Sequence, residues 1–244
     1  MTLGVYGLVS PAPRRIGVTG VAGERLRVVT VGAVSAIVGD VTRAPRPTEA
    51  NLRKYDVVMR TLARNSAALL PARFGTQFRD LDELSLVLQS RQLSLRRLLR
   101  HVRNRAQITI RIVVAQPHVG RTLPAPRSGE AGSGPLGEPN RVRPTSGSST
   151  SGSRTSGSTY LKGLAAEAAR AREIPGFDPV RAAVRRWVRD ERIERQATVA
   201  SVYHLIPRGS VDVYHAALDR AARTTGLRLR VSGPWPPYAF TTSF

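Results

Sequence analysis

Alternating and clustered apolar residues in the first half of the chain predict an antiparallel sheet. Residues 4–9 are typical of a first strand. Two further strands are expected at 26–31 and 34–38, and the two residues between them, Gly-Ala, favour a tight hairpin. Apolar residues at every second position from Ile108 predict another strand, which we expect to close this first domain.

Two amphipathic helical patterns accompany these strands. Thr48 is a good N-cap, and the chain after it carries an apolar stripe at helical spacing, made of Leu52, Tyr55, Met59 and Leu62. Asp80 and Glu83 form a capping-box-like pair before a second helical region. That region carries arginines that we expect on a solvated helix face: Arg96, Arg97, Arg100 and Arg103. Residues 1–116 are therefore predicted to form an N-terminal α+β domain, an antiparallel sheet with helices.

Residues 117–158 differ in kind from the chain on either side. Of these 42 residues, 27 are Gly, Ser, Pro or Thr, and apolar residues are few. Such a segment cannot bury enough apolar surface to offset the entropy of ordering it. We predict a flexible Gly/Ser/Pro-rich linker between two domains.

The pattern of residues 159–244 predicts a second, smaller α+β domain. An alanine-rich helix is expected to about Arg172, and a second helix over 182–195, where mixed charges favour ion pairs on a solvated face. A strand follows at 198–206. Ser210 is then expected to cap a helix whose apolar stripe contains Val211, Tyr214, Leu218 and Ala221. Alternation over 227–231 predicts a last strand, so the unit is strand, helix, strand.

The end of the chain combines three prolines with aromatic residues. Prolines at three of four positions from Pro234 fix φ and remove backbone donors, which predicts an extended, polyproline-like segment. One interpretation is a clasp, in which the rings pack on the domain's own core. The other is a partner-binding element, since stiff segments lose little entropy on docking. Its residues would be Trp235, Pro236, Pro237, Tyr238 and Phe240.

Composition adds a strong positive charge. The net charge is +21, and 36 of the 38 basic residues are arginine, because Lys54 and Lys162 are the only lysines. This charge raises nucleic acid as a partner, but an arginine bias in coding explains the imbalance equally well. The arginines are also spread over the whole chain. An arginine-rich nucleic-acid-binding protein is therefore the alternative hypothesis, and we otherwise expect only non-specific binding to nucleic acid.

Residues typical of enzymes and metal sites are missing from the sequence. The four histidines, His101, His118, His204 and His215, show no metal-ligand spacing, and the chain has no cysteine. No nucleophile elbow or phosphate-binding loop occurs. We expect no catalytic residues, no metal and no cofactor. No segment approaches the ~20 apolar residues of a membrane span, and no signal-peptide pattern opens the chain, so we expect a cytoplasmic protein without membrane contact.

Four motifs in order resemble the gas vesicle protein F/L family. They are Val5-Tyr6-Gly7-Leu8-Val9, Leu70-Pro71-Ala72-Arg73-Phe74-Gly75-Thr76, His204-Leu205-Ile206-Pro207-Arg208, and the tail Ser232-Gly233-Pro234-Trp235-Pro236-Pro237-Tyr238-Ala239-Phe240. The tail is the most specific of them. Structural-motif residues carried over from the resemblance are Pro71, Arg73, Phe74, Gly75, Thr76, Gly233 and Pro234.

The resemblance implies both a fold and a role. The fold would be α+β with two domains, the second ferredoxin-like. The role would be a non-enzymatic accessory protein for gas vesicle assembly, acting as a chaperone, a nucleation factor or a minor shell component. Its partners would be the small hydrophobic major shell protein and other gas vesicle accessory proteins, and it would associate with gas vesicles.

The charge generates a first testable prediction. Binding of the full chain to a random DNA duplex should be detectable at 50 mM salt and at least about a hundredfold weaker at 200 mM, because counterion release drives it. Fluorescence anisotropy at the two salt concentrations measures this. A submicromolar dissociation constant for DNA that persists at 200 mM salt would instead support a dedicated nucleic-acid-binding protein.

Overall fold

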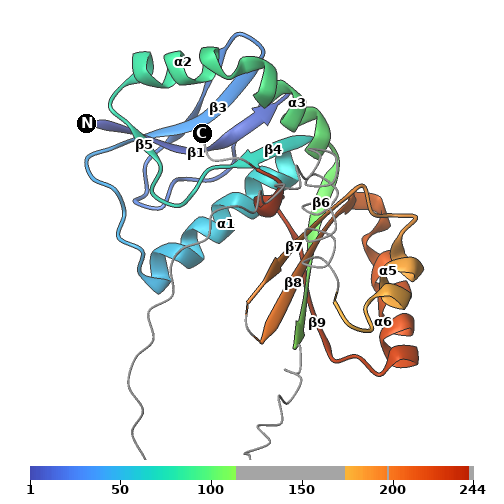
Figure 1. Cartoon of the computed structure of the whole chain (residues 1–244). Coiled ribbons are helices and arrows are strands. Elements are labelled where there is room, and N and C mark those ends of the chain that lie inside the picture. The colour runs from blue at the N-terminus through green and yellow to red at the C-terminus, as the bar shows by residue number, and fades with distance from the viewer. Residues whose placement is uncertain (114–173, 197, 242–244) are drawn as a thin grey trace, which may run out of the picture. The chain divides into compact units, whose positions relative to one another are not determined.

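Two antiparallel sheets form the framework of the chain (Figure 1). The computed structural model describes residues 1–113, 174–196 and 198–241. All of them lie in one compact unit. The predicted linker, 117–158, and the helix predicted to Arg172 lie outside the described residues.

The first sheet is built around its first strand, β1. The strand order is β2-β3-β1-β4, and a short strand, β5, also pairs with β1. The strands are β1 (Thr2–Ser10), β2 (Leu26–Val31), β3 (Val34–Val41), β4 (Ala68–Pro71) and β5 (Gln77–Phe78). The predicted hairpin is confirmed, since β2 and β3 pair directly around the turn. Seven consecutive residues of β1 are buried, so both faces of this strand are covered.

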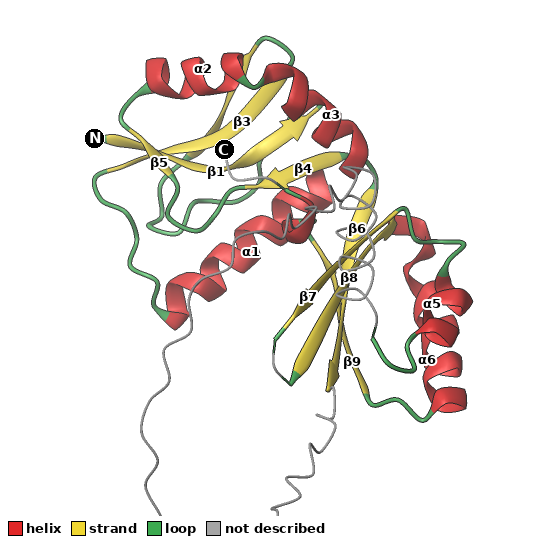
Figure 2. Cartoon of the chain, in the orientation of Figure 1, coloured by secondary structure: helices red, strands yellow, loops and turns green. Residues whose placement is uncertain are grey.

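Helices cover the first sheet on both faces (Figure 2). Helix α1 (Glu49–Asn65) packs on one face, where Tyr55, Met59 and Leu62 are buried against strand residues. Helices α2 (Leu81–Ser90) and α3 (Gln92–Val102) pack on the other. Of the predicted α1 stripe, only Leu52 lies outside the core, with 45% of its surface exposed. The arginines of α3 and of its C-cap are exposed as expected: Arg96, Arg97, Arg100 and Arg103.

The helix caps predicted at Thr48 and Asp80 are present. The Thr48 hydroxyl accepts a hydrogen bond from the Asn51 amide at 3.3 Å. Asp80 accepts one from the Glu83 amide at 2.9 Å, and the Glu83 carboxylate in turn accepts from the Arg79 amide. These bonds satisfy amides that the first helical turn leaves without partners.

The second sheet has the strand order β7-β8-β6-β9. Its strands are β6 (Arg105–Val113), β7 (Asp190–Arg195), β8 (Val199–Pro207) and β9 (Leu229–Trp235). Helices α5 (Asp178–Val184) and α6 (Val211–Thr225) lie on one face of it (Figure 1). The order β6, α5, β7, β8, α6, β9 with this pairing is the ferredoxin-like arrangement.

The strand expected to close the first domain belongs to this second sheet. β6 begins at Arg105 and pairs with β8 and β9, and it makes no ladder with the first sheet among the described residues. Alternating isoleucines identify a strand and its buried face but not its partners, because the alternation is the same whichever sheet the strand joins. The segment 114–173 thus connects β6 to α5 inside the ferredoxin-like unit. The domain limits 1–116, 117–158 and 159–244 otherwise stay predictions.

The helix expected over 182–195 is also corrected. The helix ends at Val184, and Asp190–Arg195 forms strand β7, paired with β8. The charged run is compatible with the period of a helix and with that of a strand. As in a strand, the partly buried Glu191 and Ile193 alternate with the exposed Arg192 and Glu194. Pairing with β8 decides between them. The strand predicted at 198–206 is confirmed as β8, and the helix after Ser210 as α6. The predicted cap is wrong, because the Ser210 side chain makes no capping hydrogen bond.

A buried polar network ties the second sheet to its helices. His204 is completely buried, and its Nε2 donates to Glu191 at 2.8 Å across the β7–β8 ladder. The hydroxyl of Tyr214 on α6 lies 2.6 Å from His204 Nδ1. Arg181 on α5 donates to the same Glu191 carboxylate at 3.2 Å. Burial opposes ionisation, but the His204 hydrogen bond and the charges of His204 and Arg181 outweigh it and hold the pKa of Glu191 below its ordinary value of 4.5.

This network predicts an acid-sensitive part of the stability. The pKa of Glu191 is lowered in the fold, so its ionised form stabilises above pH ~4.5, and this contribution is lost as the pH falls through the lowered pKa. Glu191→Gln should cost about 1.5–3 kcal/mol at pH 7 and should reduce the stability loss between pH 7 and pH 3.5. Urea unfolding at both pH values measures this.

The matched control is Glu194→Gln, which changes an exposed carboxylate on the same strand. It should leave the acid dependence intact. If the wild type and Glu191→Gln lost the same stability between pH 7 and pH 3.5, Glu191 would not be the source of the acid sensitivity.

Candidate functional site

The proline-rich tail follows a path that differs from the predicted one. Strand β9 continues to Trp235 at the edge of the sheet, and its Gly233–Pro234 peptide bond is cis. A short 3-10 turn over Tyr238–Phe240 follows. The polyproline-like prediction is therefore wrong for most of the tail. An edge strand tolerates proline because that side of its ladder needs no donor.

The tail packs so closely on β6 that position 233 requires a glycine. Its φ is +124°, and a Cβ at this position would lie 2.8 Å from the Gln107 carbonyl oxygen. The β6–β9 register shifts between Gln107 and Thr109, opposite this glycine. The bulge lets the chain pass close to β6 and then turn toward the first sheet.

Two contacts fasten the turn that ends the tail. The Ala239 amide donates to the side-chain oxygen of Gln107 at 2.8 Å, and the Gln107 amide donates to Thr109 at 3.1 Å. Phe240 is fully buried and belongs to the core cluster that includes Leu205 of β8 and the α2–α3 side of the first sheet. These contacts are those of a clasp.

The central motif is also structural. Pro71 ends β4 opposite Gly7, and Gly75 has a φ of +79°, which makes the turn toward β5. Thr76 closes that turn with a 2.8 Å hydrogen bond from its hydroxyl to the Arg73 carbonyl. Phe74 packs edge-on against Tyr55 of α1 with ring centroids 5.3 Å apart. The motif therefore joins the sheet to α1.

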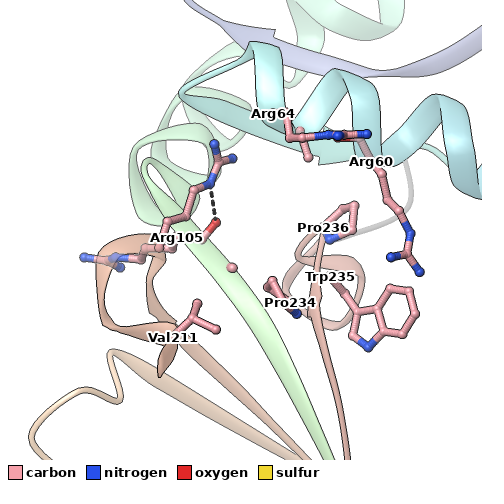
Figure 3. Close-up of a pocket in the computed structure, with 10 residues that line it drawn as sticks. Arg60, Arg64, Arg105, Val211, Pro234, Trp235 and Pro236 are labelled. Atoms are coloured by element: carbon pink, nitrogen blue, oxygen red, sulfur yellow. Dashed lines mark hydrogen bonds between the residues drawn. The ribbon is translucent and has the colours of Figure 1, made fainter. Parts of the chain in front are cut away.

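A cavity of about 400 Å³ lies beside the tail (Figure 3). One wall is the end of β9 with Pro234, Trp235 and Pro236, and the opposite side is helix α1. The remaining lining comes from the start of β6 and the turn into α6. The residues are Arg60, Ala63, Arg64, Arg105, Ala106, Arg208, Val211, Pro234, Trp235 and Pro236.

The charged side chains of this cavity are all arginines. Arg60 pairs with Asp56 at 2.7 Å, and its guanidinium lies 4.3 Å from the centre of the Trp235 ring. Arg105 donates to the His101 carbonyl at 2.6 Å. Arg208 donates to the carbonyls of Ser66 and Arg105, and burial lowers its pKa from the ordinary value. We call this site the arginine–tryptophan pocket.

A second hollow, of about 410 Å³, opens on the face of the second sheet opposite α5 and α6. Trp235 and Tyr238 line it together with strand residues. Arg111 and Arg230 face each other across the β6–β9 ladder in this hollow. Trp235 therefore borders both hollows.

The predicted partner-binding residues divide into two groups. Pro236, Pro237 and Phe240 are buried within the chain's own fold. Trp235 is half-buried and Tyr238 is 37% exposed. The partner-binding prediction therefore narrows to these two rings.

The arginines of the pocket were missed by the sequence analysis. Arg60 and Arg64 are one helical turn apart, which the sequence reveals, but Arg105 and Arg208 reach them only through the fold. No group of three or more metal-ligating side chains forms in the part of the chain that the structure describes. Among the same residues, no helix has the length and apolarity that a membrane span needs.

Comparison with known proteins gives one consistent result. The family model described as "Gas vesicle synthesis protein GvpL/GvpF" matches residues 3–242. Gas vesicle protein F of Streptomyces sp. (strain CB03234) is 27% identical over 252 residues, covering 98% of this chain and 99% of that protein.

Two crystal structures share the fold. GvpF from Anabaena sp. PCC7120 matches with a TM-score of 0.68 at 13% identity, over 100% of this chain and 97% of that one. GvpF from Microcystis aeruginosa matches with a TM-score of 0.65 at 14% identity, over 98% of both chains. At these identities the structural matches establish the fold alone, and they confirm the predicted α+β class.

The clasp makes a stability prediction. Phe240→Ala should lower the free energy of unfolding by about 3–5 kcal/mol, because it leaves a cavity in a closed core. Tyr238→Ala, which removes a partly exposed ring two residues away, should cost much less. Urea unfolding of both variants measures the difference. If the two variants lost the same free energy of unfolding, Phe240 would not be packed in the core as described.

Proposed function

The chain belongs to the gas vesicle synthesis protein GvpL/GvpF family, and we therefore propose that it is a non-enzymatic accessory protein that binds the hydrophobic shell protein during gas vesicle assembly. The single observation that carries this proposal is the match of the family model from residue 3 to residue 242. The chain would act as a chaperone, a nucleation factor or a minor shell component. It would be a cytoplasmic protein associated with gas vesicles, with the shell protein and other gas vesicle accessory proteins as partners.

The physical need for such a binder follows from the shell itself. A subunit that builds a water-repelling inner face exposes apolar surface before it assembles. That surface favours aggregation unless another protein covers it. A rigid aromatic contact serves this purpose at low entropic cost.

Trp235 and Tyr238 are the residues of the tail that support this contact. Both rings are held in place by the clasp through Phe240 and Gln107. Trp235 nevertheless borders both hollows, and Tyr238 borders the second one. A partner would therefore meet pre-positioned rings instead of a free chain end. The arginine content alone supports the nucleic-acid alternative, whereas the family match supports the assembly role.

Co-expression with a gas vesicle shell protein tests the proposal. The wild-type chain should raise the soluble fraction of the shell protein several-fold and co-purify with it. The double variant Trp235→Ala/Tyr238→Ala should lose most of both effects while remaining folded. Quantitative immunoblots of soluble and insoluble fractions measure this.

Leu93→Ala is the matched control, because it removes an apolar side chain that is 74% exposed on α3. This variant should behave as the wild type. Unchanged solubility and no co-purification with the wild-type chain would refute the assembly role, and equal loss in the control would refute the tail contact. Probing washed, intact vesicles for the chain separates a resident component from a transient chaperone.

A further inference from the structure

The arginine–tryptophan pocket holds more positive charge than the described part of the chain neutralises. Four arginines line it, and no acidic residue does. Arg60 has a carboxylate partner in Asp56. Within the described residues, Arg64, Arg105 and Arg208 donate only to backbone carbonyls. A carbonyl satisfies a hydrogen bond but leaves the charge of the guanidinium unbalanced.

This imbalance is greatest at Arg105 and Arg208. Arg105 and Arg208 are both half-buried, and burial lowers the pKa of Arg208. A partly desolvated cation without a counter-charge is unfavourable, so an anion bound beside either guanidinium would be stabilised more than at an exposed surface. The electrostatics therefore favour a carboxylate or another small anionic group as occupant.

The other half of the pocket is apolar. Trp235, Val211 and the rings of Pro234 and Pro236 form its walls. The two prolines offer no backbone N–H to a ligand. An occupant that matches the whole lining must therefore carry an anionic group and apolar surface side by side.

We propose that the arginine–tryptophan pocket binds an acidic segment of a protein partner, with Asp or Glu carboxylates on Arg64, Arg105 and Arg208 and a neighbouring apolar side chain against Val211 and the proline rings. Guanidinium groups bind carboxylates through paired, charge-assisted hydrogen bonds. This inference rests on the proposed function in one respect, namely that the partner is a protein of gas vesicle assembly. It adds that acidic residues of that partner are recognised here.

The pocket suits a nucleotide or a nucleic acid less well. A base would need a free aromatic face, but the Arg60 guanidinium already lies 4.3 Å over the Trp235 ring. Phosphate sites in proteins commonly use backbone N–H groups, and the proline wall provides none. An acidic peptide needs neither feature.

Trp235 provides a direct reporter for occupancy. The chain has two tryptophans, so Trp187→Phe leaves Trp235 as the only one. In this background, the full chain is titrated at 150 mM salt with acetyl-Leu-Glu-Leu-Glu-Leu-amide, and the emission of Trp235 is recorded. The same peptide with glutamine in place of glutamate, and a single-stranded oligo-dT, are the comparison ligands.

The acidic peptide should change the Trp235 emission saturably and bind at least about tenfold more tightly than the glutamine peptide. Arg105→Gln should weaken it by about tenfold or more. Because Arg105 also bonds to the His101 carbonyl, Arg64→Gln is a second test at an exposed position, with a smaller loss expected. Arg220→Gln, which removes one charge from the exposed side of α6, should leave the affinity unchanged.

Three results would overturn the inference: equal affinity for the two peptides, equal loss in Arg105→Gln and Arg220→Gln, or tighter binding of oligo-dT that depends on Arg105. Co-expression of the wild-type chain with the shell protein, compared with the peptide titration, separates this inference from the proposed function. If the wild-type chain solubilises the shell protein but ignores the acidic peptide, the inference fails and the proposed function stands. If the wild-type chain binds the peptide but solubilises no shell protein, the proposed function fails and the binding of acidic segments stands.

Discussion

The buried side chain of Gln107 is the contact on which the candidate site depends. It lies near the start of the central strand β6 and holds the Ala239 amide at the end of the chain. With that amide fixed, Phe240 enters the core and Trp235 lies against Arg60. A buried amide that found no partner here would cost about 1–3 kcal/mol, so the interaction fixes one position of the tail.

A second set of bonds holds the first sheet and the second together where the chain passes between them. Helix α3 leads into β6 through Asn104, which has a φ of +54°. Its amide donates to the Ala67 carbonyl at 2.7 Å, and its carbonyl accepts from the Arg208 amide at 3.0 Å. The Arg208 guanidinium reaches the Ser66 carbonyl. The same arginine that lines the pocket therefore also fixes its geometry.

Local signals in the sequence predicted much of this fold correctly. The hairpin around Gly32, the caps at Thr48 and Asp80, and the β8–α6 turn all depend on residues close together in the chain. Non-local pairing was the source of the errors. β6 has a clear strand pattern, but its alternation does not say which sheet it joins.

The site was predicted only in part, for a related reason. The proline and aromatic pattern identified the tail and the clasp, but it could not tell that Phe240 is buried while Tyr238 retains surface. The arginine–tryptophan pocket could not be predicted from the sequence, because α1, β6 and the turn after β8 meet only in the folded chain. In a chain with 36 arginines among its basic residues, sequence alone gives no reason to single out Arg105 or Arg208.

Amide hydrogen exchange at Ala239 tests the central claim, that the tail is fastened to the body of the protein and presents Trp235 in one position. The account predicts that this amide exchanges far more slowly than in an unstructured peptide, and that Gln107→Ala abolishes the protection while the amides of β1 stay protected. Exchange of the Ala239 amide at the unprotected rate in the wild-type chain would contradict the account.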